Sequence, residues 1–515
     1  MRSVQQCNAL YHALRSGEMA EQAQSSRELF ILPDGTSVSD NAFFALASSM
    51  AHALVGVGAK PGDRIAVQVE KSVAALALYI ACVQAGLVFL PLNTDYTVHE
   101  LDYFLKDAEP GVFVVDPHKE DKLRELTNDN DVVLFTLSQA GDGSLIDAAE
   151  YHQQQFVTVA RRNDDLVAIL YTSGTTGRSK GAMLTQENLL SNARTLVEAW
   201  QFTNADVLLH ALPIFHTHGL FVACNVIFIA GGRLLFQPSF NIDSIIQALP
   251  QASCLMGVPT FYTRLLADKR LNRSLVGHIR LFISGSAPLL RDTHRAFTKR
   301  TGLCILERYG MTETNMNTSN PYFGERIAGT VGLPLPGVEV RVLDQDSGEI
   351  CDTGKIGMLH VRGPNVFVGY WRMPDKTRDE LLEDGFFITG DLASIDTAGY
   401  VTIAGRDKDL IISAGYNIYP GEIELLLDAV PGVLESAVVG APHADLGEAG
   451  VAVVVRENSA VGDALDETTL LESIKDKLAR FKQPRVVVFV AHLPRNTMGK
   501  IQKKELRRDV RLRFT

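Results

Sequence analysis

The 515-residue sequence contains few cysteines, and they form no pattern. No C-x-x-C pair occurs, which argues against a disulfide scaffold or a zinc ribbon and fits a reducing compartment. We therefore expect a cytoplasmic protein. Arg2 and Arg15 precede the first acid, Glu18, without the apolar core of a signal peptide, so a mitochondrial presequence stays open. The six dispersed cysteines are Cys7, Cys82, Cys224, Cys254, Cys304 and Cys351.

The chain also has no excess of basic residues and no uninterrupted membrane-length apolar run. Its 49 Lys and Arg residues against 60 Asp and Glu residues give a net charge of −11, which argues against nucleic acid as a partner. Residues 72–92 approach the length of a transmembrane helix. Gln84-Ala-Gly86 interrupts this run, and Gly86 is placed as a helix stop. We expect a buried helix followed by a buried strand, and no membrane span.

Short apolar runs alternate with segments of helical spacing from residue 64 onward. Strands are predicted at 65–69, 112–115 and 132–137, and helices at 71–85 and 99–107. This alternation predicts parallel sheets covered by helices. The last hundred or so residues predict a compact α+β domain, with strands at 437–439 and 449–455. Its helix has one apolar face made by Leu470, Leu471, Ile474, Leu478 and Phe481.

One loop-like stretch, 171–181, has the sequence Y-T-S-G-T-T-G-R-S-K-G. It lies between an apolar run, 166–170, and a run of helical spacing that begins near Thr185, a predicted N-cap. A strand, a loop and a helix in this order present backbone N–H groups to an anion. We expect a polyphosphate site, with Ser173, Thr175, Thr176 and Lys180 as further donors. It is not an ordinary P-loop, because Arg178 and Ser179 separate the second glycine from the lysine.

This stretch resembles the phosphate-binding signature of the adenylate-forming superfamily, which includes acyl-CoA synthetases, adenylation domains of peptide synthetases and luciferases. Four later motifs follow in the order of that family, so the resemblance covers essentially the whole chain. They are E-R-Y-G-M-T-E at 307–313, T-G-D at 389–391, G-R-D-K-D-L at 405–410 and P-R-N-T-M-G-K at 494–500. The resemblance implies an α/β fold with a large N-terminal domain, 1–405, a hinge, 406–410, and a small mobile C-terminal domain, 411–515.

The resemblance also implies an ATP site. Tyr309 would stack on adenine, Thr312 would donate to the α-phosphate, and Asp391 would accept from the ribose. Catalytic roles are implied for Lys500, Glu313 and Thr312. A carboxylate beside the phosphates needs a cation between them, so Glu313, with Thr172, predicts a Mg²⁺ site. The full set of expected ATP-binding residues is Thr172, Ser173, Gly174, Thr175, Thr176, Gly177, Lys180, Ser286, Ala287, Tyr309, Thr312, Asp391, Arg406 and Lys500.

The acyl pocket is expected around Arg308, because residues 307–321 most resemble malonyl-CoA synthetases. A guanidinium gives the distal carboxylate of malonate a bidentate partner. Arg264 is a second candidate, and a structural ion pair between Arg308 and Glu307 or another surface acid is the alternative. Arg280 is interpreted as structural. The other expected acyl-site residues are His216, Thr217, Met311 and Ser286.

The histidines 216 and 218 also suggest zinc, but no third ligand lies at convincing spacing. The leading hypothesis is ATP-dependent ligation of malonate to coenzyme A through an acyl adenylate, with Lys408 as the hinge. Ser413, Gly415 and Tyr416 would meet CoA. The alternatives are methylmalonate or a short or medium fatty acid as the substrate, a carrier-loading adenylation enzyme, a luciferase-like oxygenase and a nucleotide sensor. Free CoA is favoured because no carrier domain follows. We expect a monomer or a homodimer.

Overall fold

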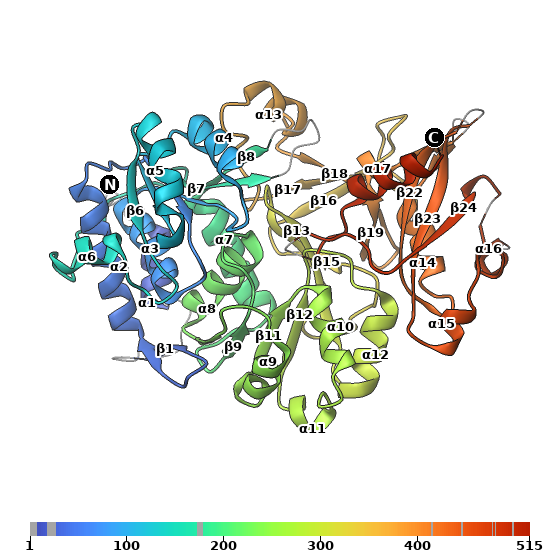
Figure 1. The fold of residues 1–515 in the computed structure, drawn as a ribbon, viewed down its shortest axis with the longest axis horizontal. Coiled ribbons are helices and arrows are strands. Elements are labelled where there is room, and N and C mark those ends of the chain that lie inside the picture. The colour runs from blue at the N-terminus through green and yellow to red at the C-terminus, as the bar shows by residue number, and fades with distance from the viewer. Residues whose placement is uncertain are drawn as a thin grey trace.

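The structure is a computed structural model that describes residues 8–17, 27–172, 179–413, 416–443, 446–475, 477–478, 480–496 and 499–514. Figure 1 shows a large body, coloured blue to yellow, and a smaller C-terminal body, coloured orange to red, at its side. Hydrophobic cores follow the same division, because one pair of clusters ends at Ile403 and the other begins at Ile411. The predicted α/β class, with a large N-terminal and a small C-terminal domain, is confirmed.

The first sheet of the large body has five parallel strands and one antiparallel edge strand. In spatial order these are β6 (Val133–Thr136), β5 (Val112–Val115), β3 (Arg64–Gln68), β4 (Val88–Pro91), β7 (Leu166–Thr172) and β8 (Lys180–Thr185). Helices around it are α2 (Asp40–Gly56), α3 (Val73–Ala85), α4 (Val98–Ala108), α5 (Glu120–Asp129) and α6 (Ser144–Glu150), with η1 (Pro117–Lys119). Gly86 ends α3 in a left-handed conformation (φ 70°), as predicted.

The second sheet is parallel through six strands and antiparallel at both edges. Its order is β15 (Leu333–Pro334), β14 (Asn315–Ser319), β13 (Ile305–Met311), β12 (Leu281–Ser284), β11 (Cys254–Gly257), β9 (Val207–His210), β10 (Arg233–Phe236), β1 (Glu28–Ile31) and β2 (Ser37–Ser39). Its helices are α1 (Ala9–Ser16), α7 (Gln186–Ala199), η2 (His218–Cys224), α8 (Asn225–Ala230), α9 (Ile242–Ala248), η3 (Leu249–Gln251), α10 (Pro259–Ala267), α11 (Arg273–Val276) and α12 (Arg291–Thr301).

A four-stranded antiparallel sheet completes the large body, and a five-stranded sheet forms the small one. The former contains β16 (Glu339–Leu343), β17 (Gly357–Arg362), β18 (Phe387–Ile395) and β19 (Val401–Arg406), with α13 (Pro374–Glu380) nearby. After η4 (Asp407–Asp409) come β20 (Ile411–Ser413), β21 (Tyr416–Ile418), α14 (Pro420–Leu427), β22 (Val433–His443), β23 (Gly447–Arg456), α15 (Ala460–Ala464), α16 (Glu467–Lys475), η5 (Arg480–Lys482), β24 (Val486–Val490) and α17 (Lys503–Phe514).

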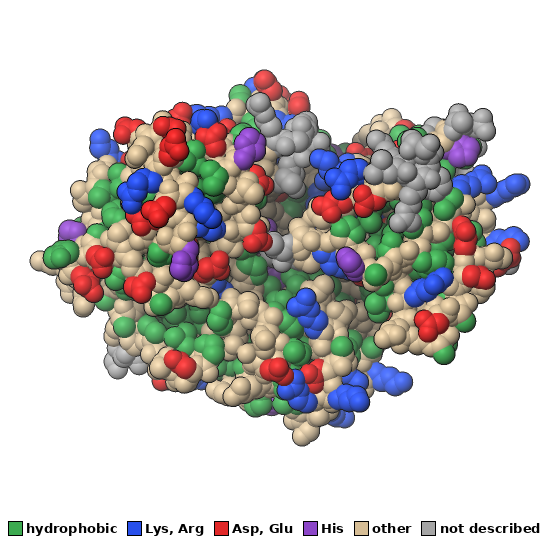
Figure 2. Space-filling model, viewed as in Figure 1, with side chains coloured by type: hydrophobic (Ala, Val, Ile, Leu, Met, Phe, Trp, Pro, Cys, Tyr) green, Lys and Arg blue, Asp and Glu red, His purple; other side chains and the backbone are tan. Residues whose placement is uncertain are grey.

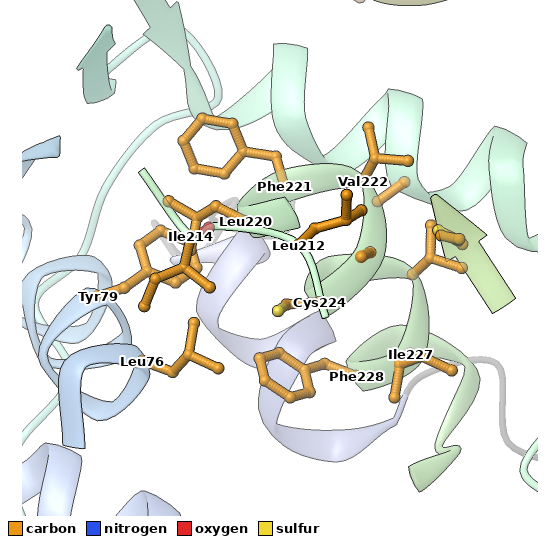
Figure 3. Close-up of a cluster of buried hydrophobic side chains, with 14 of the residues drawn as sticks. Leu76, Tyr79, Leu212, Ile214, Leu220, Phe221, Val222, Cys224, Ile227 and Phe228 are labelled. Atoms are coloured by element: carbon orange, nitrogen blue, oxygen red, sulfur yellow. The ribbon is translucent and has the colours of Figure 1, made fainter. Parts of the chain in front are cut away.

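A buried apolar cluster packs the π-helical turn η2 against α3 (Figure 3). The Tyr79 and Phe221 rings lie 5.8 Å apart, and the Tyr79 hydroxyl donates to Asn225 at 3.3 Å. Polar side chains at the start of this turn are therefore held by a packed core. Burial of such rings is the main favourable contribution to this arrangement.

Two results concern the predicted elements directly. The interpretation of 171–181 as a loop that runs straight into a helix is wrong, because β8 intervenes and pairs antiparallel with β7. The helix starts only at Gln186, with Thr185 as its N-cap, as predicted. Nowhere in the described residues does a helix combine the length and the hydropathy that crossing a bilayer requires.

Candidate active site

The β7–β8 hairpin brings together the two ends of the predicted phosphate loop. Thr172 and Lys180 are register partners, so their backbones lie side by side at the end of the hairpin from which the loop departs. Residues Ser173, Gly174, Thr175, Thr176 and Gly177 lie outside the described residues. The hairpin therefore fixes both ends of this loop and presents Lys180 from a rigid strand.

Lys180 is buried and contacts a carboxylate that sequence reasoning missed. Its Nζ lies 3.3 Å from both carboxylate oxygens of Glu380, and it donates to the Tyr370 hydroxyl at 3.1 Å. The same ammonium lies 4.1 Å from the centroid of the Tyr370 ring. Glu380 is the last residue of α13, 200 positions along the chain, and belongs to no motif with a known spacing. Only the fold brings it to the lysine.

Glu313 is buried beside this group. One oxygen, Oε1, lies 3.1 Å from the Tyr370 hydroxyl and accepts from the Thr172 hydroxyl at 3.4 Å. Within the described residues, no Lys or Arg lies at ion-pair distance from Glu313, and no three His, Cys, Asp or Glu residues gather around a metal-sized gap. A buried carboxylate without a cationic partner, next to a hydroxyl, is a donor set that suits a hard cation such as Mg²⁺.

The residues expected at the nucleoside form a second paired group. The Tyr309 hydroxyl donates to Asp391 Oδ2 at 2.6 Å, and Arg406 Nε lies 2.6 Å from Asp391 Oδ1. Asp391 and Arg406 are also register partners on β18 and β19. Burial, together with the Asp391 charge, raises the pKa of Tyr309 well above its ordinary value. Thr312 follows β13, and Ser286 and Ala287 follow β12, all three half-buried.

Arg308 is buried, and the described residues form no ion pair with it. Its Nε and Nη2 atoms have no hydrogen-bond partner among the described residues, and only 4% of the residue is exposed. Burial lowers the pKa of Arg308 to about 9, although the Tyr262 hydroxyl acts in the opposite direction. A Cβ at Gly285 would overlap the guanidinium, so this glycine is what lets the arginine lie against the backbone.

Glu307 does not neutralise Arg308. Consecutive residues of a strand point to opposite faces, and the Glu307 carboxylate accepts instead from the Gly329 N–H at 3.2 Å. Burial raises the pKa of Glu307 to about 8, against the smaller effects of that bond and of Arg291. The ion pair considered as the structural explanation of Arg308 is therefore not formed.

The turn that leads into η2 also carries buried polar side chains with unpaired atoms. His218 Nδ1 lies 3.1 Å from Ser286 Oγ, whereas His218 Nε2 and Thr217 Oγ1 are buried without partners in the described chain. Burial, then the nearby Arg308 charge, lowers the pKa of His218 well below its ordinary value. Burial lowers the pKa of His216 to about 4. Both imidazoles are neutral at pH 7, and Arg308 supplies the positive charge.

The structure separates the other acyl-site candidates. Arg264 is exposed on α10, lines a surface groove with Asn241 and Asp268, and places its guanidinium 5.7 Å from the Phe240 ring centroid. Met311 is half-buried at the end of β13, with Sδ 3.9 Å from the Tyr309 hydroxyl.

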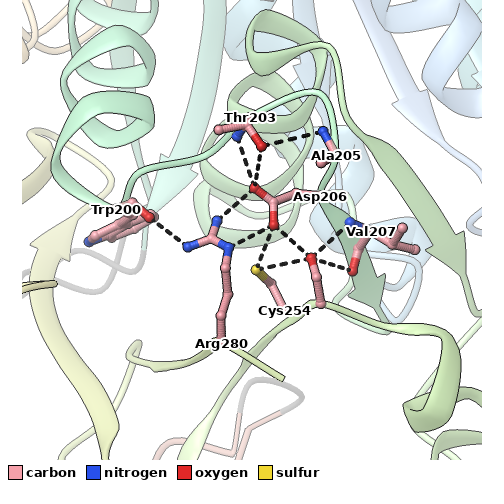
Figure 4. A network of polar contacts seen from close by, with 8 residues as sticks. Trp200, Thr203, Ala205, Asp206, Val207, Cys254 and Arg280 are labelled. Atoms are coloured by element: carbon pink, nitrogen blue, oxygen red, sulfur yellow. Dashed lines mark hydrogen bonds and ion pairs between the residues drawn. The ribbon is translucent and has the colours of Figure 1, made fainter. Parts of the chain in front are cut away.

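Arg280 lies in a network of its own (Figure 4). It makes two bonds of 2.7 Å to Asp206 and one of 2.9 Å to the Trp200 carbonyl. These contacts join the end of α7 to β12, which is a structural role.

The small body brings Lys500 to the site. A Cβ at Gly499 would lie 3.1 Å from the Thr260 hydroxyl of α10, so this loop packs against the large body. Figure 2 shows a notch in the surface along the junction of the two bodies. The residue as a whole is exposed, but the protein around its amine desolvates it. That effect, with the Arg406 charge, lowers the pKa of Lys500 to about 8.

The predicted hinge is held from both sides. Arg406 is bound to Asp391, and Asp407 accepts from Gln345 at 2.7 Å, both contacts with the large body. Arg507 of α17 binds Asp409 and donates to the Lys408 carbonyl at 3.3 Å. Lys408 lies between these two sets of contacts.

Of the residues expected to meet CoA, Ser413 is buried at the end of β20 and Gly415 lies outside the described residues. Tyr416 is described only as the backbone of β21.

Comparison with known proteins agrees with this architecture. Residues 18–371 match the family "AMP-binding enzyme", and residues 422–500 match "AMP-binding enzyme C-terminal domain". A malonate–CoA ligase from Arabidopsis thaliana is 33% identical over 88% of this chain and 79% of its own length. A feruloyl-CoA synthase from Amycolatopsis sp. is 35% identical over 92% of this chain and 94% of its own.

Crystal structures of MatB from Rhodopseudomonas palustris are also similar. The ATP-bound form is 54% identical over 98% of this chain and 100% of its own, with a TM-score of 0.94. The apo form, 53% identical over 99% of this chain and 100% of its own, gives 0.85. The structure as a whole is thus more similar to the ATP-bound form.

Proposed function

We propose that this chain, which belongs to the AMP-binding enzyme family, is an ATP-dependent acid–thiol ligase that joins malonate to coenzyme A. A malonate carboxylate oxygen attacks the α-phosphorus of ATP, and pyrophosphate leaves. The CoA thiol then attacks the carbonyl of the malonyl adenylate, the thiol proton goes to solvent, and AMP leaves. The protein needs no nucleophilic side chain for this chemistry, because its task is to hold several anions together.

The observation that carries the malonate assignment is the buried guanidinium of Arg308, which has no carboxylate partner among the described residues. Leaving such a charge unpaired costs free energy, which a ligand carboxylate would recover. Charge-assisted hydrogen bonds are worth about 1.5–3 kcal/mol, or roughly a 10- to 150-fold preference over a monocarboxylic acid. The unpaired His218 Nε2 and Thr217 Oγ1 add polar contacts on the same side. A fatty acyl chain would leave all of these groups unsatisfied.

The nucleotide side supports the same proposal. Glu313 and Thr172 would hold Mg²⁺, which when bound neutralises phosphate charge and orients the pyrophosphate leaving group. Lys180 would bind the β- and γ-phosphates, and Thr312 and Lys500 would contact the α-phosphate. Asp391 would exchange its contact with Tyr309 for the ribose hydroxyls, which frees the tyrosine ring to stack on adenine.

The hinge contacts support a rotation between the two half-reactions. With Arg406 and Asp407 tied to the large body and Asp409 tied to α17, Lys408 is the residue at which the small body would turn. The rotation would remove Lys500 from the α-phosphate and present the segment of Ser413, Gly415 and Tyr416 to the thiol of CoA.

The test measures pyrophosphate release with ATP, Mg²⁺ and CoA across malonate, methylmalonate, acetate, butyrate and octanoate. We expect malonate to be preferred, and Arg308→Met to lower its kcat/KM by about 100-fold with little change for butyrate. Arg264→Met tests the second candidate, and Arg295→Met, exposed on α12, is the control. Better turnover of octanoate than of malonate by the native protein would overturn the malonate assignment.

A further inference from the structure

Lys180 already has a carboxylate partner in the protein, at the position where the proposed function requires it to bind phosphate. Glu380 approaches the ammonium with both oxygens at 3.3 Å, and its Oε1 also lies 2.8 Å from Lys376 Nζ. The side chains of Lys180 and Glu380 are 11% and 20% exposed, so water screens this pair only partly. Burial alone would raise the pKa of Glu380, but Lys376, Tyr370 and Lys180 together lower it, so the carboxylate is ionised at pH 7.

Tyr370 connects this pair to Glu313. Its hydroxyl lies 2.6 Å from Glu380 Oε2 and 3.1 Å from Glu313 Oε1. A phenol has one proton to donate, and the shorter contact goes to Glu380. The carboxylate that pairs with Lys180 and the carboxylate that would hold Mg²⁺ thus both contact one hydroxyl.

Glu380 is fixed near Lys180 by the backbone on both sides. The Tyr370 N–H donates to Thr377 Oγ1 at 2.9 Å, which ties α13 to the segment before it. Tyr370 in turn forms a β-bridge with Ala182 of β8, two residues from Lys180. These two contacts link the helix of the glutamate to the strand of the lysine, so we expect Glu380 to stay close when phosphates arrive.

We propose that Glu380 is a positioning residue that holds Lys180 in place and competes with the β- and γ-phosphates for its charge, so that pyrophosphate is bound less tightly and leaves more readily. The proposal rests on the proposed function in one respect, the contact of Lys180 with these phosphates. An ammonium shared between a carboxylate and a phosphate attracts the phosphate less, and the nearby carboxylate also repels it. The residue would thus affect pyrophosphate and AMP, the products of the first and second steps, differently, because AMP has only an α-phosphate.

The test is equilibrium binding of magnesium pyrophosphate and of AMP to the full chain, measured by calorimetry without any carboxylic acid. Glu380→Gln keeps the size of the side chain and removes its charge. We expect its Kd for pyrophosphate to fall about five- to tenfold while its Kd for AMP stays unchanged. Asp379→Asn is the matched control, because it removes the same charge from the adjacent exposed position and should leave both values unchanged.

Equal pyrophosphate Kd values for native protein and Glu380→Gln would overturn the proposal, as would a parallel shift for AMP or for Asp379→Asn. Glu380→Asp keeps the charge but shortens its reach; it should tighten pyrophosphate binding by a smaller factor, and it decides the question if the glutamine variant does not fold. The experiments distinguish a failure of this proposal from a failure of the malonate assignment. Tighter pyrophosphate binding by Glu380→Gln in a protein that does not turn over malonate would support the role of Glu380 and contradict only the malonate assignment.

Discussion

The two sides of the candidate site differ in how their polar groups are satisfied. On the nucleotide side most polar groups bind one another, as Asp391 does with Tyr309 and Arg406, and Lys180 with Glu380, and Glu313 has hydroxyl neighbours. On the acyl side, Arg308 and His218 are buried and carry donor or acceptor atoms without partners in the described residues. Nucleotide binding would therefore exchange one set of bonds for another, whereas a carboxylate on the acyl side would supply bonds that are missing.

This difference has a consequence for selectivity. Exchange of existing bonds gives a small net free energy, so nucleotide affinity depends on many modest contacts. A ligand that satisfies a buried charge recovers a desolvation cost that a neutral ligand leaves in place. We therefore expect the acyl side to discriminate between substrates more sharply than the nucleotide side, at the expense of the stability of the empty protein.

The largest expected effect is on stability, on the paired side. Asp391→Asn removes the charge that binds Arg406 and weakens the bond from Tyr309, so it should lower the free energy of unfolding by about 2–3 kcal/mol. Urea denaturation followed by tryptophan fluorescence measures this, because Trp200 and Trp371 both report on the large body.

The control for Asp391→Asn is the same substitution in an exposed ion pair. Asp164 lies 3.0 Å from Arg162, with side chains 70% and 64% exposed, and Asp164→Asn should change stability by less than about 0.5 kcal/mol. Equal losses for the two variants would mean that the pairing around Asp391 contributes no more than a surface contact.

A somewhat smaller effect, of opposite sign, is expected on the unpaired side. Arg308→Met replaces a buried charge with an apolar chain of similar length, and it should raise the free energy of unfolding by about 1–2 kcal/mol. Malonate should stabilise the native protein but not the variant. A variant less stable than the native protein would contradict the contrast, because it would show that the guanidinium has partners in solution.

The smallest expected effect is a pH dependence. The protonated amine of Lys500 is the form that attracts the α-phosphate, and its pKa of about 8 lies below the ordinary value for lysine. As pH rises through this value the charge is lost, so kcat/KM for ATP should fall to about half of its plateau near pH 8. Lys500→Arg stays charged and should lose the decline, although its rate is lower. If kcat/KM of this variant declined with pH as in the native protein, the decline would come from the titration of another group.

Sequence analysis succeeds for the features that neighbouring residues determine. Thr185 as an N-cap, Gly86 as a helix stop and the strand at 112–115 are confirmed because neighbouring residues determine each of them. The roles assigned to Lys500 and Glu313 stay predictions, carried by motifs that the fold brings to one region.

Residues that act through distant contacts were missed or placed wrongly. Glu380 reaches Lys180 only because the fold brings the end of α13 to the start of β8, and no spacing along the chain signals this. The strand β8 was missed because the run after the loop is short and was interpreted with the helix that follows it. The choice between Arg308 and Arg264 depended on burial, which composition and periodicity do not specify when both residues lie near apolar segments.

The contacts on both sides of Lys408 restrict the backbone torsion angles about which the small body is expected to rotate. With the preceding residues fixed to one body and the following peptide fixed to the other, the path of the small body is set mainly by two torsion angles of a single residue. A joint of this kind constrains direction as well as distance, so Lys500 and the Ser413 segment would move along one arc. Arrival of one at the adenylate would then require departure of the other, which makes the two half-reactions mutually exclusive by geometry alone.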